Sequence, residues 1–95
     1  MTHTLRIRMR KVEGALARLL GLVGRRSYDV LGFAAKMSAD RSEFEIVMEF
    51  DSLYPPGQPG HRPPDVLARM VAKLYDVTRV ELEGEAVPPP GGAQG

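Results

Sequence analysis

The chain has 95 residues, of which 43% are hydrophobic and 26% are charged, and its formal net charge is +1. This length suits one compact domain, and the balanced charge excludes strong electrostatic capture of nucleic acid or of a membrane surface. There is no cysteine, which excludes disulfides and thiolate chemistry. No apolar stretch approaches the ~20 residues needed to cross a bilayer, so we expect a cytoplasmic protein.

The first half of the chain predicts a strand, a helix and a hairpin. Residues 4–10 alternate apolar side chains with arginines, which is the period of a half-buried strand. From Glu13 to Arg26 the apolar residues recur at three- and four-residue spacing, which predicts an amphipathic helix. Residues 29–37 and 43–51 have the composition and length of strands and are separated by a polar turn, so we expect them to pair.

The second half begins with a proline-rich loop. The prolines at residues 63–64 suit the entrance of a helix, and apolar spacing continues that helix as far as Leu74 or Tyr75. Residues 77–83 alternate again and predict the last strand. We assign residues 4–84 to one domain and expect residues 85–95, which are rich in proline and glycine, to form a disordered tail.

The predicted order of strands and helices, βαββαβ, is that of the α+β ferredoxin-like sandwich. Right-handed crossovers give an antiparallel four-stranded sheet with both helices on one face. In that sheet the first strand lies between the third and the fourth, and the second strand forms an edge. Because this fold serves many unrelated functions, the function must be argued from particular residues.

The open face of the predicted sheet is a charged surface on which acidic columns flank the arginines of the first strand. An RNA-binding module of this fold needs aromatic rings on that face for base stacking. None is expected here, and the carboxylates would repel phosphate. We therefore expect a solvated, charge-balanced face that does not bind nucleic acid. Its predicted members are Arg6, Arg8, Arg10, Glu45, Glu49, Arg79, Glu81 and Glu83.

Catalytic chemistry has little support in the sequence. The two histidines, His3 and His61, lie near the N-terminus and in the proline loop, and neither has a metal ligand or a triad partner near it in sequence. The serines lie at the ends of predicted elements, where turns and helix caps use this residue. We therefore expect no catalytic residue, no metal site and no cofactor.

The edge strand carries a row of small, uncharged residues. We expect Val30, Gly32 and Ala34 to face outward, with Lys36 as the one charge that protects the edge. Such an edge can pair with a second copy of the chain to form a homodimer. The alternative is that the proline loop covers the edge.

The turn into the first predicted helix is a second notable feature. Gly14 and Ala15 leave the first backbone N–H groups of the helix without a side chain over them. A helix N-terminus of this kind can bind a carboxylate. An ordinary tight turn would use the same residues, so the pattern alone leaves both interpretations open.

Three stretches of the chain carry a distinctive pattern, at residues 13–19, 24–31 and 73–81. They include Glu-Gly-Ala-Leu, Arg-Arg-Ser-Tyr-Asp-Val and Lys-Leu-Tyr-Asp-Val. In these stretches the chain resembles the ACT domain and, within that family, the small regulatory subunits of acetolactate synthase (acetohydroxyacid synthase). The resemblance implies a non-catalytic regulatory or stabilising subunit of that thiamine-diphosphate-dependent enzyme, which acts in branched-chain amino acid biosynthesis. A free-standing amino-acid sensor with another client enzyme is the alternative.

The same resemblance implies an effector site between two subunits, with valine, isoleucine or leucine as the effector. The residues carried over are Lys11, Val12, Glu13, Gly14 and Ala15 from the turn, and Asp29, Val30 and Leu31 from the edge strand. Valine-sensitive members usually carry asparagine at the positions of Lys11 and Asp29, so this chain would hold the zwitterion by charge. The alternative is a small subunit that does not respond to an effector.

Overall fold

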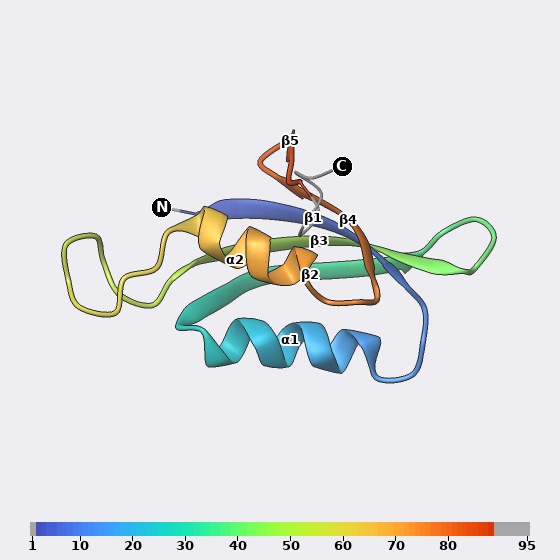
Figure 1. Cartoon of the computed structure of the whole chain (residues 1–95), viewed down its shortest axis with the longest axis horizontal. Helices are drawn as coiled ribbons and strands as arrows, with labels where there is room; N and C mark the ends of the chain where they lie inside the picture. The colour runs from blue at the N-terminus through green and yellow to red at the C-terminus, as the bar shows by residue number, and fades with distance from the viewer. Residues whose placement is uncertain (1, 89–95) are drawn as a thin grey trace.

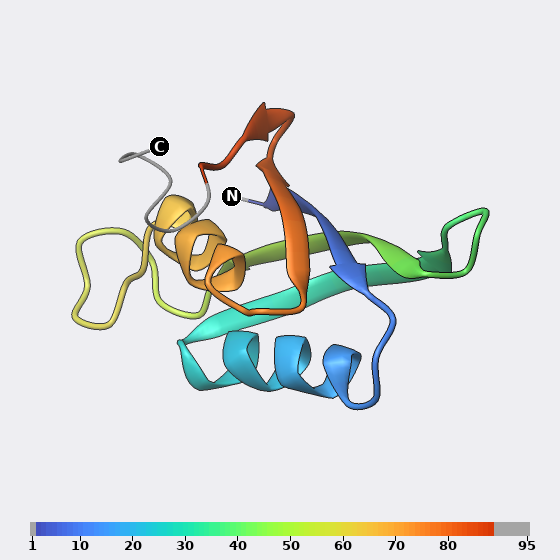
Figure 2. The same cartoon turned by 45° about the vertical axis from the view of Figure 1, so that its right-hand side comes forward.

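The computed structural model describes residues 2–88, which form a five-stranded antiparallel sheet with both helices on one of its faces (Figure 1 and Figure 2). The elements in chain order are β1 (His3–Arg10), α1 (Ala15–Arg25), β2 (Tyr28–Met37), β3 (Glu43–Ser52), α2 (Pro64–Ala72), β4 (Val77–Leu82) and β5 (Glu85–Ala86). The strand order β2-β3-β1-β4-β5 confirms the predicted positions of the first four strands, with β2 at one edge. Neither of the helices described is long and apolar enough to span a membrane.

The fifth strand corrects the predicted four-stranded sheet. β5 pairs with the end of β4, and the turn between them includes Gly84 with a φ of 90°. Just after β5, Val87 donates its N–H to the carbonyl of Val80 and packs its side chain against the core. The predicted boundary at residue 84 therefore falls inside the sheet, because a two-residue strand is too short to show a period. The remainder of the predicted tail, residues 89–95, lies outside the described residues.

The core lies between the sheet and the two helices. The predicted alternation of β1 is confirmed, because Leu5, Ile7 and Met9 are buried while the arginines between them are exposed. β3 alternates in the same way and buries Ile46, Met48 and Phe50. Each helix adds one apolar stripe, and the buried helix residues are Ala15, Leu19, Leu22, Val23, Leu67, Ala68 and Val71. Removal of these side chains from water is the main stabilising contribution to such a fold.

Tyr28, at the start of β2, ties the second helix to the core. Its ring packs edge-on against Phe50, with the ring centroids 5.7 Å apart. Its hydroxyl donates a hydrogen bond to the carbonyl of Pro63 over 2.6 Å. Burial raises the pKa of Tyr28, so the hydroxyl keeps the proton that it donates. Because Pro63 is the N-cap of α2, this hydrogen bond helps to fix where the second helix begins.

The turn between β2 and β3 is held by Asp40. Its carboxylate accepts hydrogen bonds from the hydroxyl and the N–H of Ser42, over 2.7 and 3.0 Å, and from the hydroxyl of Ser38 over 2.8 Å. These bonds, the one from the Ser42 hydroxyl above all, lower the pKa of Asp40 to about 2. Both serines therefore have the turn role that their positions predicted.

β2 is the predicted edge strand, but a β-bulge changes which of its residues share a face. Val30 pairs with Phe50 and Gly32 pairs with Glu49, so Leu31 is an extra residue between two ladder positions. Directly opposed residues point to the same side of a sheet, which places Val30 on the helix side with Phe50. The predicted outward row of Val30, Gly32 and Ala34 is therefore wrong for Val30.

The proline loop does not cover the edge of the sheet. It lies at the end of the sheet where β2 begins (Figure 1), and it is folded on itself. The ring of His61 is hydrogen-bonded to the carbonyl of Tyr54 over 2.9 Å, and the N–H of Arg62 donates to the hydroxyl of Ser52 over 3.2 Å. Beyond Tyr28, every residue of β2 is exposed except the half-buried Gly32. The edge therefore stays open along almost its whole length.

Candidate functional site

The predicted effector loop, residues 11–15, joins β1 to α1. Gly14 is the N-cap of the helix and has a φ of 78°, a left-handed conformation that favours glycine. No side chain caps the helix, as predicted. The N–H of Ala15 was predicted to be available for a ligand, but it donates a hydrogen bond to the carbonyl of Val12 over 3.1 Å. The N–H of Lys11 donates to the carbonyl of Ser42 over 3.0 Å, which fixes the start of the loop against the β2–β3 hairpin.

Arg18 adds a cation to this turn that was not identified from the sequence. Its Nε, at 3.1 Å, and its Nη2 both donate to Oδ2 of Asp76, a residue in the turn between α2 and β4. Its Nη1 lies over Gly14, where an added Cβ atom would be only 3.0 Å away. The signal in the sequence was the spacing, because residues 14 and 18 are one helical turn apart and share a face.

Asp76 is the buried member of this ion pair. Its side chain is 2% exposed, whereas that of Arg18 is 46% exposed. Oδ1 of Asp76 has no hydrogen-bond partner among the described residues, so the charge of this carboxylate is balanced mainly by Arg18. The backbone carbonyl of Asp76 also accepts a hydrogen bond from the N–H of Arg10 over 2.7 Å. The pair thus joins the first turn of α1 to the α2–β4 turn beside the end of β1.

The second half of the predicted effector site is at the start of β2. Asp29, Val30 and Leu31 are all exposed, and the exposed fraction of Leu31 is 51%. Asp29 faces another carboxylate, that of Asp51, across the ladder to β3. This half therefore offers negative charge beside two accessible apolar side chains, which suits an ammonium group with an aliphatic neighbour.

A single chain does not bring the two halves together. α1 has 11 residues, which corresponds to a length of about 16 Å. Gly14 is at the N-terminal end of this helix, and Asp29 follows its C-terminal end after a short turn (Figure 1). Because the helix separates the halves, one small amino acid cannot contact both of them within one copy of the chain.

Most of the chain matches a known protein family. A family model described as the ACT domain matches residues 11–80. The chain belongs to the ACT-domain family. ACT domains are regulatory, non-catalytic modules with an amino-acid-binding role. The matched residues of this ACT domain include both halves of the candidate site and the ion pair of Arg18 with Asp76. No curated protein matches the chain.

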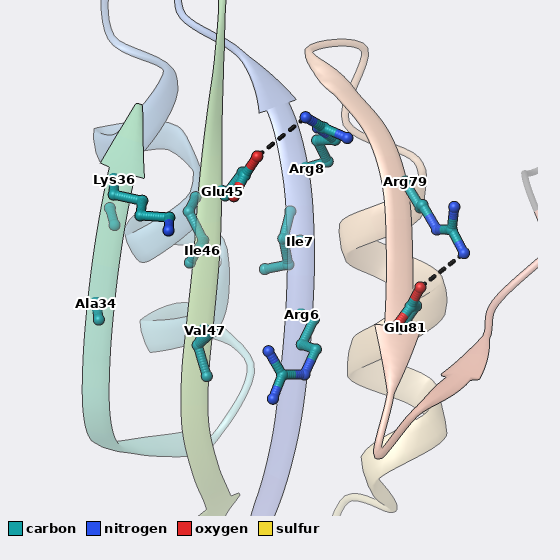
Figure 3. A pocket seen from close by; sticks show the side chains of 11 residues that line it. Arg6, Ile7, Arg8, Ala34, Lys36, Glu45, Ile46, Val47, Arg79 and Glu81 are labelled. Atoms are coloured by element: carbon teal, nitrogen blue, oxygen red, sulfur yellow. Dashed lines mark hydrogen bonds and ion pairs between the residues drawn. The ribbon is translucent and has the colours of Figure 1, made fainter. Parts of the chain in front are cut away.

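The open face of the ACT domain contains a hollow of about 640 Å³ (Figure 3). Its lining residues are Arg6, Ile7, Arg8, Ala34, Ala35, Lys36, Glu45, Ile46, Val47, Arg79 and Glu81. Arg8 pairs with Glu43 over 2.8 Å and with Glu45 over 3.0 Å. These pairs agree with the predicted balance of charge between β1 and β3. Glu81 lies opposite Arg6 of β1 but pairs with Arg79 of its own strand, over 2.7 Å. The face is therefore largely neutralised by its own residues.

Each of the two histidines is hydrogen-bonded to another residue of the fold. The ring of His3 is 2.9 Å from a carboxylate oxygen of Glu83, and that of His61 contacts the loop carbonyl already described. Among residues 2–88, no three histidine or acidic side chains are grouped as a metal site would require.

The ion pair of Arg18 with Asp76 predicts an asymmetry between two arginines of α1. Arg18→Met should lower the free energy of unfolding by about 2 to 3 kcal/mol, because it leaves a buried carboxylate without its partner; the exposure of Arg18 keeps the loss below that of a fully buried pair. Arg25→Met is the matched control, because Arg25 lies over Gly21 as Arg18 lies over Gly14 but has no ion pair among the described residues. It should change stability by less than about 0.5 kcal/mol. Urea denaturation measures both, and equal losses would contradict the proposed role of Asp76.

Proposed function

We propose that this ACT domain is the non-catalytic small subunit of an amino-acid biosynthetic enzyme, with acetolactate synthase as the client. The three stretches that resemble the small subunits of that enzyme lie at the turn into α1, at the junction of α1 with β2, and at the α2–β4 turn. The first and third are joined by the ion pair of Arg18 with Asp76. The second includes Tyr28, which packs into the core. A free-standing amino-acid sensor with another client remains the second candidate.

The observation that carries the proposal is the separation of the two halves of the effector site by α1. A homodimer can unite them if two β2 strands pair antiparallel. α1 runs antiparallel to β2 (Figure 1), and its length of about 16 Å equals about five strand residues. Gly14 therefore lies beside the part of β2 near Phe33. Antiparallel pairing centred on Leu31 puts Asp29 of one copy opposite Phe33 of the other, because the two residues are equally far from Leu31 along the strand.

The chemistry of the edge favours such a pairing. Leu31, Phe33 and Met37 are exposed apolar side chains on β2, and the outer backbone groups of an edge strand are available to a further strand. Pairing would cover these side chains and continue the sheet into the second copy. Gly32 and Ala34 are the two members of the predicted interface row that do share a face. Gly32 would lie next to the twofold axis, and Ala34 would lie about 10 Å from it.

An amino acid bound in this dimer would be held by charge at both of its ends. Its carboxylate would meet Lys11 and Nη1 of Arg18 at the N-terminus of one α1. Its ammonium would meet Asp29 of the second copy. A branched apolar side chain would contact Val12, Val30 and Leu31, which are all exposed in the single chain. Valine, isoleucine and leucine are the effectors that fit this arrangement.

The dimer predicts different effects of two matched leucine substitutions. Leu31→Lys should raise the dissociation constant of the homodimer about tenfold or more, because it places a charge at the centre of the paired strands. Leu53→Lys is the control, since Leu53 is equally exposed, at 53%, but lies in the proline loop. Sedimentation equilibrium measures both variants. A monomeric wild type at tens of micromolar, or equal weakening by the two variants, would contradict pairing through β2.

The effector site predicts that binding depends on Gly14. Calorimetric titration should detect binding of at least one of valine, isoleucine and leucine at millimolar concentration. Gly14→Val should abolish it, because the left-handed φ disfavours a β-branched residue and the new side chain would crowd Arg18.

Gly57→Val is the matched control for strain at Gly14. Gly57 has a similar φ of 86° but no neighbour within 4 Å, so its replacement should leave binding intact. Absence of binding to the wild type would favour a structural subunit that does not respond to an effector. Binding unaffected by Gly14→Val would place the site elsewhere.

A further inference from the structure

Two cations on the open face of the sheet have no ion pair among residues 2–88. They are Arg6 on β1 and Lys36 on β2, both of which are exposed and line the hollow. Of the other two cations of the hollow, Arg8 pairs with two carboxylates, Glu43 and Glu45, and Arg79 pairs with Glu81. The four cations and these three carboxylates therefore leave one net positive charge at the hollow.

The two free cations flank an apolar floor. Val47 lies directly opposite Arg6 on one side and directly opposite Ala34 on the other, so these three residues form one row across β1, β3 and β2. Lys36 follows Ala34 by two residues on the same face. Figure 3 shows the side chains of Arg6 and Lys36 both leaning toward β3, one from each side. A ligand lying on Val47 would therefore meet a cation on either side.

The shape of the hollow suits a protein segment better than a small molecule. It extends from β2 to β4 across four strands, a width of about 14 Å at the usual strand spacing. Both helices lie on the opposite face (Figure 2), so no described element covers the hollow. Small-molecule sites enclose most of their ligand. Nucleic acid is a poorer match, because the lining has no aromatic ring on which a base could stack.

We propose that this face docks an acidic segment of another protein, in which carboxylates alternate with apolar side chains. The carboxylates would pair with Arg6 and Lys36, and an apolar side chain would contact Val47 and Ala34. The face is free for this purpose in the proposed dimer, because pairing through β2 uses the strand edge and not the open face. The inference concerns a surface distinct from the effector site and does not require that any amino acid binds.

A labelled peptide tests the docking surface. The probe is a fluorescein-labelled decapeptide of alternating glutamate and valine, and the control peptide has lysine in place of glutamate. Fluorescence anisotropy at low salt should show saturable binding of the acidic peptide alone. Added sodium chloride should weaken the binding, because it screens exposed charges. Amide NMR shifts on binding should fall on the open face around Val47.

Two double variants of equal charge change locate the site. Arg6→Glu with Lys36→Glu should weaken peptide binding about tenfold or more. Arg25→Glu with Lys73→Glu makes the same charge change at exposed positions at the ends of α1 and α2, and should alter binding by less than about twofold. Because Arg6 and Lys36 are exposed and unpaired, their variant should fold, and circular dichroism checks this.

Several outcomes would overturn the proposal. These are the absence of peptide binding at low salt, equal weakening by both double variants, and NMR shifts confined to the helices. A single-stranded oligouridine that displaces the peptide at a lower concentration than unlabelled peptide would also overturn it, in favour of a nucleic-acid surface.

Discussion

The packing of α1 antiparallel along β2 is the constraint on which the functional account depends. The helix places Gly14 at one end and Asp29 beyond the other, and its length of about 16 Å exceeds the span of an amino acid. One chain therefore carries two half-sites. The same arrangement leaves the outer backbone groups of β2 open, with apolar side chains beside them. The edge that can pair with a second copy is thus the element that can complete the site.

Periodicity predicted the elements whose two faces differ in polarity. Arginines alternate with apolar residues on β1, and acidic residues alternate with them on β3, so a slip of one residue would bury charges in the core. The bulge at Leu31 could not be predicted in this way. Val30, Leu31 and Gly32 are all uncharged, so either register is compatible with the composition of this segment. β5 was missed because two residues cannot show a period.

The sequence predicted which segments contribute to the candidate site, but not the contacts that these segments make with one another. The left-handed Gly14 and the uncapped helix follow from the local sequence. Arg18 and Asp76 are 58 residues apart, so their pairing depends on how the α2–β4 turn packs against α1, and no local pattern reports it. The bond of the Ala15 N–H to Val12 likewise depends on the conformation of the turn. The spacing of residues 14 and 18 indicates that they share a face, but the ion pair of Arg18 with Asp76 emerged only in the folded chain.

Complementation between two defective chains tests most directly whether the effector site is shared between subunits. Gly14→Val and Asp29→Ala should each abolish binding of the effector amino acid, as measured by calorimetry. In a mixed dimer, the intact Gly14 of one chain meets the intact Asp29 of the other at one of the two sites. An equimolar mixture, unfolded and refolded together, should therefore recover about a quarter of the wild-type binding capacity, since half of the dimers are mixed and each has one intact site. A mixture that binds no more than its separate components would contradict a shared site.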